Sequence, residues 1–260
     1  MKNKGCSNML AIERRNAILA KLQDERKVVV SELATVFNVT EETIRRDLDK
    51  LEKEGMAKKT YGGAILNENL NIDLPYTVRK KANVEGKMHI AQVVSELVED
   101  GAHIILDAST TALAVAQKIK EKNDITVITN SIEIILELSD KPGFKVLSTG
   151  GMLKEGSLAL VGYQTERMIG TFHVDVAIVS CKGIDIEHGL TDSNEADAEV
   201  KKSIIKSSNR TILAVDSTKF DKISFTTICD FDDIDIIVTE KKPDDRWIKF
   251  AEQKNIDIIY

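Results

Sequence analysis

Arginine and threonine side chains are predicted to gather on one face of a helix near the start of the sequence. Ile44, Leu48 and Leu51 recur at positions i, i+4 and i+7, so they share the buried face. Arginine can read guanine in the major groove and lysine can neutralise phosphate, so cations opposite this face are suited to binding double-stranded DNA. The alternative is an ordinary helical hairpin with a solvated charged face. The outward residues are Thr43, Arg45, Arg46 and Lys50.

The residues before this helix complete a helix-turn-helix pattern. Ser31 is expected to cap a short first helix, and Asn38 tolerates the left-handed turn that follows it. Thr40 can then cap the second helix. Two short helices, a tight turn and cations on the outer face of the second helix are typical of DNA-binding helix-turn-helix units.

A basic hairpin is predicted directly after the second helix. Two strand-like pieces flank Gly62-Gly63, and a Gly-Gly pair suits a tight turn that needs positive φ. Lys58, Lys59 and Tyr61 are expected to lie beside the phosphate backbone. The helices and the hairpin together indicate a winged helix-turn-helix domain.

A second set of polar residues follows strands predicted later in the sequence. Ser109, Thr110 and Thr111 open a helix, where free backbone N–H groups and hydroxyls can hold a phosphate. Lys219 or Lys182 can supply the counter-charge. With hydrogen-bonding groups for hydroxyls nearby, this pattern predicts a site for a small phosphorylated sugar or polyol. The residues expected to bind sugar hydroxyls are Asp107, Asn130 and Glu195.

The elements that must position these residues alternate regularly after residue 101. The predicted strands are 103–107, 125–129, 145–151, 174–181, 210–216 and 233–240, and the last five residues can add another. The predicted helices are 111–120, 131–138, 163–169, 195–207 and 244–253. Alternating strands and helices favour a doubly wound parallel sheet, in which ligands bind where the strands end.

Composition narrows the class of protein. No apolar run approaches the roughly 20 residues that span a bilayer, and no secretory leader is apparent, so a cytoplasmic protein without a membrane partner is expected. The three cysteines and four histidines lack metal-ligand spacing, so no metal, cofactor or disulfide is expected. Residues 1–66 hold 13 Lys and Arg against 10 Asp and Glu, whereas the remainder holds 23 against 32. This asymmetry favours a small nucleic-acid-binding module attached to an acidic domain.

Two short motifs in the first domain resemble the DNA-binding domain of the DeoR family of bacterial sugar-metabolism regulators. They are Thr43-Ile44-Arg45-Arg46-Asp47-Leu48 and Tyr61-Gly62-Gly63-Ala64. The family commonly has arginine, threonine and histidine before its Gly-Gly-Ala, where this chain has Lys59, Thr60 and Tyr61. Lysine keeps the charge but lacks the bidentate fork of arginine.

The second half resembles the effector domain of the same regulators, which is related in fold to ribose-5-phosphate isomerase and glucosamine-6-phosphate deaminase. The motifs are DASTT (107–111), ITNS (128–131), STGG (148–151), GLTDSNEADAEVKK (189–202) and VDSTKF (215–220). Ser109 stands where many members have glycine. The effector-site residues that the resemblance implies are Asp107, Ser109, Thr110, Thr111, Asn130, Gly151, Glu195, Lys201 and Lys219.

The sequence therefore predicts a winged helix-turn-helix domain at 1–66, a linker at 67–75 and an effector-binding domain at 76–260. The expected function is that of a transcriptional regulator, a repressor of carbohydrate-utilisation genes that a phosphorylated sugar releases from operator DNA. A homo-oligomer, dimer or tetramer, is expected because operators are usually symmetric. The alternatives are a sugar-phosphate isomerase or deaminase with an accessory DNA-binding domain, and an architectural DNA-binding protein without a ligand. The enzyme is disfavoured because the chain lacks the Asp-Gly-Ala-Asp-Glu run of isomerases with this fold.

Overall fold

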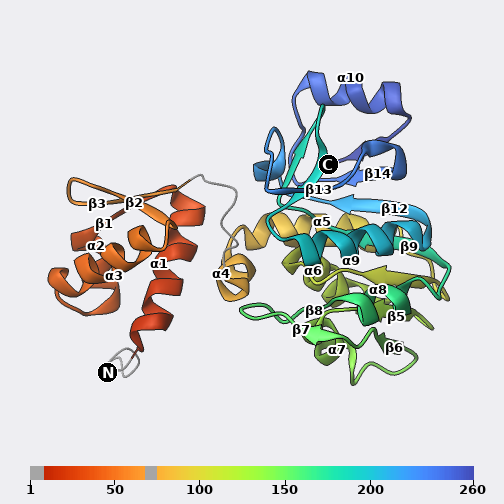
Figure 1. Cartoon of the computed structure of the whole chain (residues 1–260), viewed down its shortest axis with the longest axis horizontal. Helices are drawn as coiled ribbons and strands as arrows, with labels where there is room; N and C mark the ends of the chain where they lie inside the picture. Colours follow the sequence, from red (N-terminus) through yellow and green to blue (C-terminus); the bar gives the residue numbers. More distant parts are fainter. Residues whose placement is uncertain (1–8, 68–74) are drawn as a thin grey trace. The chain divides into compact units, whose positions relative to one another are not determined.

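The computed structural model describes residues 9–67 and 75–260, which form two compact units, Met1–Asn83 and Val84–Tyr260 (Figure 1). The predicted linker, 67–75, lies almost entirely outside the described residues. The described part of the first unit includes helix α4, Tyr76–Lys81, which the sequence places in the second domain. Val78 of α4 packs into the apolar core of the first unit, and this contact explains the assignment. In the part of the chain that the structure describes, no helix is long and apolar enough to cross a membrane.

The first unit is a winged helix-turn-helix, as predicted. Its strands form an antiparallel sheet in the order β1-β3-β2, in which the wing hairpin β2–β3 pairs with β1. Its core is aliphatic and includes Ile18, Leu33, Ile44, Leu48 and Leu51. The elements in chain order are α1 Ala11–Glu25, β1 Lys27–Val29, α2 Val30–Phe37, α3 Glu41–Lys53, β2 Ala57–Thr60, β3 Gly63–Leu66 and α4 Tyr76–Lys81.

Local chemistry sets the turn between the two helices. Asn38 ends α2 with φ 52° and ψ 49°, the left-handed conformation expected of it. Thr40 caps α3, because its hydroxyl accepts a hydrogen bond from the Thr43 amide at 3.2 Å. The expected cap by Ser31 is wrong. The helix α2 already begins at Val30, whose amide donates to the Gly62 carbonyl oxygen in the wing at 2.8 Å.

Gly62 and Gly63 serve different purposes in the wing. Gly62 has φ +83° in the turn, a conformation that side chains disfavour. At Gly63 the constraint is space, since a Cβ there would lie 2.0 Å from the carbonyl oxygen of Val28. The close approach lets β3 pair with β1, so the wing is bound into the unit.

The second unit is built on a seven-stranded sheet in the order β15-β14-β12-β9-β4-β5-β6, and every pair in it is parallel. This confirms the predicted parallel α/β architecture. Its strands are β4 His103–Leu106, β5 Thr126–Thr129, β6 Lys145–Ser148, β9 Val174–Val179, β12 Ser208–Ala214, β14 Ile236–Val238 and β15 Asp257–Ile259. Its helices are α5 Val84–Glu96, α6 Thr110–Lys118, α7 Ile132–Leu138, α8 Tyr163–Ile169, α9 Glu195–Lys206 and α10 Asp245–Lys254. Short 3-10 turns are η1 Ile119–Glu121, η2 Ser217–Lys219 and η3 Phe231–Asp233.

Two antiparallel pieces were not predicted. One is the small hairpin of β7 Met152–Leu153 and β8 Leu160–Val161, and the other is a sheet of β10 Gly183–Asp185, β11 Gly189–Asp192 and β13 Thr226–Cys229. The segment after Pro75 forms two helices, α4 and α5, rather than one, because Asn83 has φ 45° between them. The order of strands matters most for function. The chain adds β5 and β6 on one side of β4 and then returns to place β9 on the other side, which creates a switch point between β4 and β9.

Candidate functional site

The outer face of α3 carries the predicted DNA-binding arginines, Arg45 and Arg46, and both are exposed. Arg45 donates a hydrogen bond to Glu41 at 2.7 Å, and Arg46 donates to Glu42 at 3.2 Å. Exposed ion pairs of this kind contribute only about 0.3–0.5 kcal/mol to stability, so a phosphate or a base edge can displace the carboxylate from the arginine. Lys50 is also exposed.

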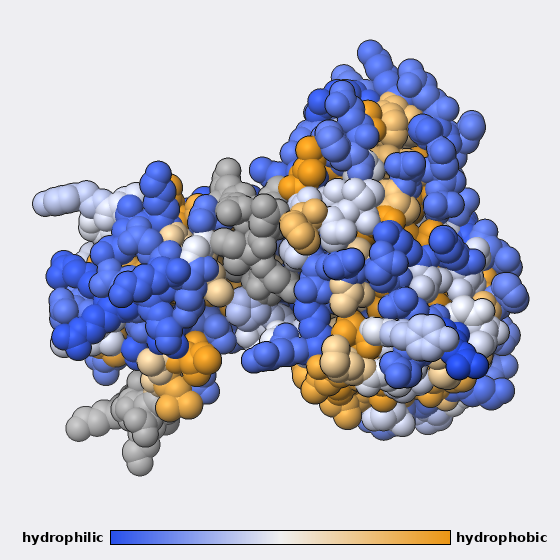
Figure 2. Space-filling model, in the orientation of Figure 1, coloured by the Kyte–Doolittle hydropathy of each residue, from blue (hydrophilic) through white to orange (hydrophobic). Residues whose placement is uncertain are grey.

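Thr43 lies at the start of α3 and is half-buried. Its hydroxyl oxygen is 2.9 Å from the hydroxyl oxygen of Thr40, the residue that caps the helix. Thr43 thus supports the helix start as well as lying beside the outer face. The surface over α2, α3 and the wing is largely hydrophilic (Figure 2).

The wing presents its three predicted DNA contacts differently. Tyr61 is fully exposed at the turn, and Lys58 projects from the exposed face of β2. Lys59 instead forms an ion pair with Asp49 of α3, and its backbone amide donates to Glu52 at 2.8 Å. The hydrogen bond between Lys59 and Asp49 lowers the pKa of Asp49 and raises the pKa of Lys59. Lys59 therefore ties the wing to α3.

In the second unit, the predicted effector residues follow neighbouring parallel strands. Asp107 follows β4, Asn130 follows β5, Gly151 follows β6, and Lys219 lies in η2 after β12. Since β6, β5, β4, β9 and β12 are consecutive in the sheet, their carboxyl ends meet at one edge. The structure thus places these residues along the edge that contains the switch point.

Asp107 lies at the switch point, 1% exposed, and joins β4 to β9. Its carboxylate accepts hydrogen bonds from the amides of Ser109 and Ser180, both at 3.0 Å. Lys201 of α9 extends its ammonium nitrogen to 3.8 Å from the same carboxylate. Burial raises the pKa of Asp107 against the opposing effect of Lys201. A buried acid, an amine and a helix start thus meet at one point.

Lys201 also pairs with Asp192, a residue of β11 that is completely buried. Burial alone would raise the pKa of Asp192, but the charges of Lys201 and Lys182 outweigh it, and the pKa is lowered. The pKa of Lys201 is raised, because the attraction of Asp192 and Asp107 exceeds the effect of its own burial. Lys201 is therefore a charged amine held between two aspartates.

A similar pairing lies at the end of β12. Asp216 is buried and accepts hydrogen bonds from the amide and hydroxyl of Thr218. Burial acts to raise its pKa, yet the charges of Lys219 and Lys87 and the hydrogen bonds from Thr218 lower it. Burial raises the pKa of the nearby Cys181 thiol to about 12, so this cysteine is not a nucleophile at neutral pH.

Some of the backbone amides at the start of α6 already have hydrogen-bond partners within the protein. The Ser109 hydroxyl accepts a hydrogen bond from the Ala112 amide at 3.0 Å and so caps the helix. Thr110 and Thr111 are both buried. The phosphate site predicted here therefore depends on the remaining amides of the first turn and on the threonine hydroxyls.

Asn130 offers an unsatisfied acceptor at the same edge. Its amide nitrogen donates to the carbonyl oxygen of Leu160 at 2.9 Å, whereas no donor among the described residues reaches its buried Oδ1. The buried hydroxyl of Ser193, next to Asp192, likewise has no hydrogen-bond partner among the described residues. Buried polar atoms without partners are uncommon in folded proteins, and a ligand is one of the ways to satisfy them.

The remaining predicted effector residues lie in the loop after β6 and on α9. Gly151 has φ +111°, and a Cβ there would lie 2.1 Å from the Thr165 hydroxyl, so this loop passes close to α8. Glu195 is exposed at the first residue of α9. Lys201 lies on the same helix but is buried in the aspartate cluster.

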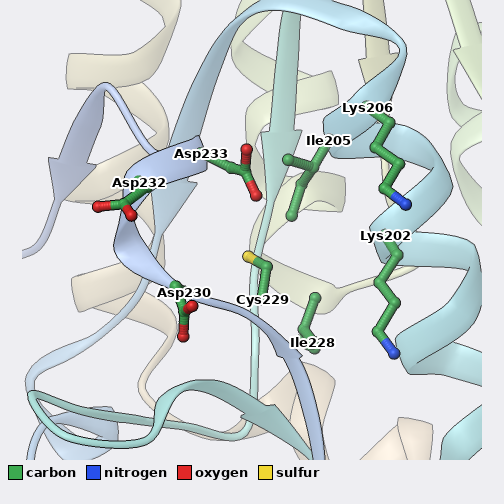
Figure 3. A pocket seen from close by; sticks show the side chains of 8 residues that line it. All are labelled: Lys202, Ile205, Lys206, Ile228, Cys229, Asp230, Asp232 and Asp233. Carbon is green, nitrogen blue, oxygen red and sulfur yellow. The ribbon is translucent and has the colours of Figure 1, made fainter.

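A pocket of about 330 Å³ lies elsewhere, between α9 and the segment from β13 to η3 (Figure 3). Lysines line one wall and aspartates line the other. None of the predicted effector residues lines this pocket. Its lining residues are Lys202, Ile205, Lys206, Ile228, Cys229, Asp230, Asp232 and Asp233.

The polar and charged side chains where the parallel strands end are called the polar edge here. The predicted set of effector residues leaves out four of its members, Asp192, Asp216, Lys87 and Ser193. Asp216 is the last residue of the predicted strand 210–216, and Asp192 lies within the family-like run 189–202. Lys87 gave no signal, because it lies on an amphipathic helix before the first strand, where a lysine is ordinarily exposed.

A winged helix-turn-helix joined to an α/β domain with a polar strand edge defines a ligand-sensing DNA-binding protein. Residues 82–241 match the DeoR C terminal sensor domain, and residues 14–69 match the DeoR-like helix-turn-helix domain. The chain belongs to the DeoR family of transcriptional regulators, as its motifs suggested. It is a regulator and not an enzyme.

Individual relatives agree over the whole length. The chain is 41% identical to the uncharacterised HTH-type transcriptional regulator YulB of Bacillus subtilis, covering 96% of each protein. It is 33% identical to the HTH-type transcriptional repressor GlcR of the same organism, covering 95% of each. Ribose 5-phosphate isomerase A of Methanocaldococcus jannaschii is a structural neighbour at TM-score 0.40 and 16% identity, covering 54% of this chain and 55% of that one, and no argument rests on this likeness.

Proposed function

We propose that this regulator represses carbohydrate-utilisation genes and that a small phosphorylated sugar releases it from operator DNA. The observation that carries the proposal is the charge at the polar edge. Lysine charges act on three buried aspartates there, so amines and carboxylates gather where the parallel strands end. The lysines are Lys87, Lys182, Lys201 and Lys219, and the aspartates are Asp107, Asp192 and Asp216.

The two kinds of polar group fit the two parts of such a ligand. Lys219 and the free amides at the start of α6 can hold the phosphate. The Asn130 Oδ1 and the Ser193 hydroxyl, which have no partner among the described residues, can accept or donate hydrogen bonds to sugar hydroxyls. Glu195, Gly151 and the two threonines complete the proposed site.

The DNA side of the proposal rests on α3 and the wing. Arg45, Arg46, Thr43 and Lys50 are proposed to enter the major groove, whereas Lys58 and Tyr61 contact the adjoining phosphates. A homo-oligomer, dimer or tetramer, would present two such units to a symmetric operator. Repression agrees with the similarity to GlcR, a transcriptional repressor, and a cytoplasmic location agrees with a DNA partner.

A thermal-shift series tests the ligand class. The intact protein is melted with sugar phosphates, with the same sugars lacking phosphate, and with inorganic phosphate, because a ligand that binds only the native state raises the melting temperature. The proposal expects a concentration-dependent rise with at least one sugar phosphate and a smaller rise with the matching free sugar. If free sugars act as well as their phosphates, or if no sugar phosphate acts, the proposed ligand class is wrong.

A further inference from the structure

The buried face of α3 contains one charged residue, Asp47, which is 4% exposed. Arg14 of α1 is 8% exposed, and its Nε donates to Asp47 Oδ2 at 2.5 Å. Arg15 places an Nη1 atom 3.6 Å from the other carboxylate oxygen. The sequence pairs neither arginine with Asp47, so this contact is a feature that only the tertiary structure shows.

The rest of the contact between α1 and α3 is aliphatic. Asp47 lies between Ile44 and Leu48, which are fully buried, and α1 contributes Ile18 and Leu22 to the same core. Apolar packing has little directionality, so it alone fixes the rotation of a helix about its axis only loosely. A carboxylate held by two guanidinium groups has a defined geometry.

A buried ion pair is weak evidence for stability, because removing two charges from water offsets much of their attraction. Its best-attested use is to fix the register of packed elements. Asp47 directly follows Arg46, so any rotation of α3 that displaces the carboxylate turns Arg46 through the same angle.

We infer that Asp47, gripped by Arg14 and Arg15, is a positioning residue for DNA recognition. It fixes the rotation of α3 against α1 so that Arg45 and Arg46 meet base edges rather than only phosphates. Asp47 does not itself touch DNA. The inference rests on the proposed role of α3 in binding the operator.

A single substitution in the ion pair could weaken DNA binding simply because it unfolds the protein, so it would not test positioning. Asp47→Ala leaves Arg14 buried without its partner, which is strongly destabilising. The double variant Arg14→Met, Asp47→Leu replaces both charges by apolar groups of similar size, and such replacements are often neutral or stabilising. Its melting temperature, followed by circular dichroism of the intact protein, is expected to equal or exceed that of the parent.

A matched control removes one positive and one negative charge from the surface of the same unit. Lys21 and Glu25 form an i,i+4 ion pair on α1, and Glu25 is exposed. The control variant is therefore Lys21→Met, Glu25→Leu. It changes charge as the test variant does but leaves the contact between α1 and α3 intact.

The measurement is affinity for two labelled duplexes at one salt concentration. One is selected from random sequences by the parent protein, and the other is a scrambled duplex of the same composition. The double variant at Arg14 and Asp47 should lose about tenfold or more of its preference for the selected duplex, the size of one lost base contact, while its affinity for scrambled DNA stays near the parental value. The control variant should keep the parental preference.

Arg46→Ala separates the two possible failures. If Arg46→Ala lowers the preference but the double variant at Arg14 and Asp47 keeps it, α3 reads DNA and the positioning inference is wrong. If Arg46→Ala also leaves the preference unchanged, the proposed role of α3 fails, and the inference fails with it.

Discussion

Asp192 is a carboxylate that folding removes from water entirely, and it keeps its charge because Lys201 and Lys182 act on it. Its pKa lies below the ordinary value of 3.8 in the folded protein. A lowered pKa means that ionised Asp192 stabilises the fold at pH values above 3.8, and that this contribution is lost as the pH falls through the lower folded value. Asp192 thus makes the second unit sensitive to acid.

The variant Asp192→Asn tests the predicted direction in which stability changes with pH. At pH 7 it should lower the free energy of unfolding by roughly 3–5 kcal/mol, because one partner of a buried ion pair is gone. The deficit relative to the parent should shrink as the pH falls below about 4, since the parental carboxylate then becomes protonated in the unfolded chain. Trp247, the only tryptophan, is buried in the second unit and reports its unfolding in denaturant. A deficit that is constant from pH 7 to pH 3 would contradict the assignment.

Sequence alone predicted some residues of the polar edge but not which of them contact one another. Asp107 and Asn130 were predictable because polar residues that end apolar strands must lie at the carboxyl edge of a parallel sheet. Asp192 was not singled out, because the antiparallel strand that buries it, β11, pairs with two segments that gave no strand signal. Likewise, Asp47 is spaced to share the face of Ile44 and Leu51, but the sequence does not show that Arg14, 33 residues earlier, is its partner.

At the scale of elements, the wing also shows what the sequence alone cannot predict. The Gly-Gly pair predicts a hairpin, but Lys58 and Lys59 are indistinguishable in the sequence. They differ in the structure because Asp49, ten residues before Lys59, forms an ion pair with Lys59. The β7–β8 hairpin was missed for a simpler reason, since strands of two residues are too short to show alternation.

The two wing lysines should respond differently to salt. Lys58→Ala should reduce the slope of log affinity against log salt by about 0.9, because one phosphate contact and its released counterion are lost. Removing the internal pair with Lys59→Ala, Asp49→Asn is neutral in net charge and should leave the slope close to parental. Fluorescence anisotropy of operator DNA between low and moderate salt measures both. The reverse order of effects would assign the phosphate contact to Lys59.

At the scale of the whole molecule, the chain is two compact units with opposite charge balance. We propose that they fold independently and that the join follows α4, at Asn83 and Val84. A fragment that begins at Val84 keeps all seven strands of the parallel sheet and the core around Trp247.

This fragment should melt cooperatively, retain the buried-tryptophan emission, and show the same thermal shift with the active sugar phosphate as the intact protein. Limited proteolysis of the intact protein should yield a stable product with nearly the same N-terminus, because exposed linkers are cut first. A fragment that is unfolded, or folded but unable to bind the ligand, would show that the first unit is needed for the second.

The coupling of ligand to DNA is the central claim. An allosteric ligand must prefer one of two states of the protein, and couplings of about 1–3 kcal/mol are typical. The site can be weakened without touching α3 or the wing. Thr110 is buried, so Thr110→Val keeps its shape and removes its hydroxyl, and Lys219→Met removes the proposed counter-charge.

The direct test is operator affinity of the intact protein, measured by anisotropy during titration with the sugar phosphate that gives the largest thermal shift. The parent should lose roughly 5–150-fold of its operator affinity at saturation. Thr110→Val and Lys219→Met should bind the operator like the parent without ligand and need higher ligand concentrations for release. Operator affinity that is unchanged by a ligand known to bind, or identical titrations for all three proteins, would contradict the proposed coupling at the carboxyl edge of the sheet.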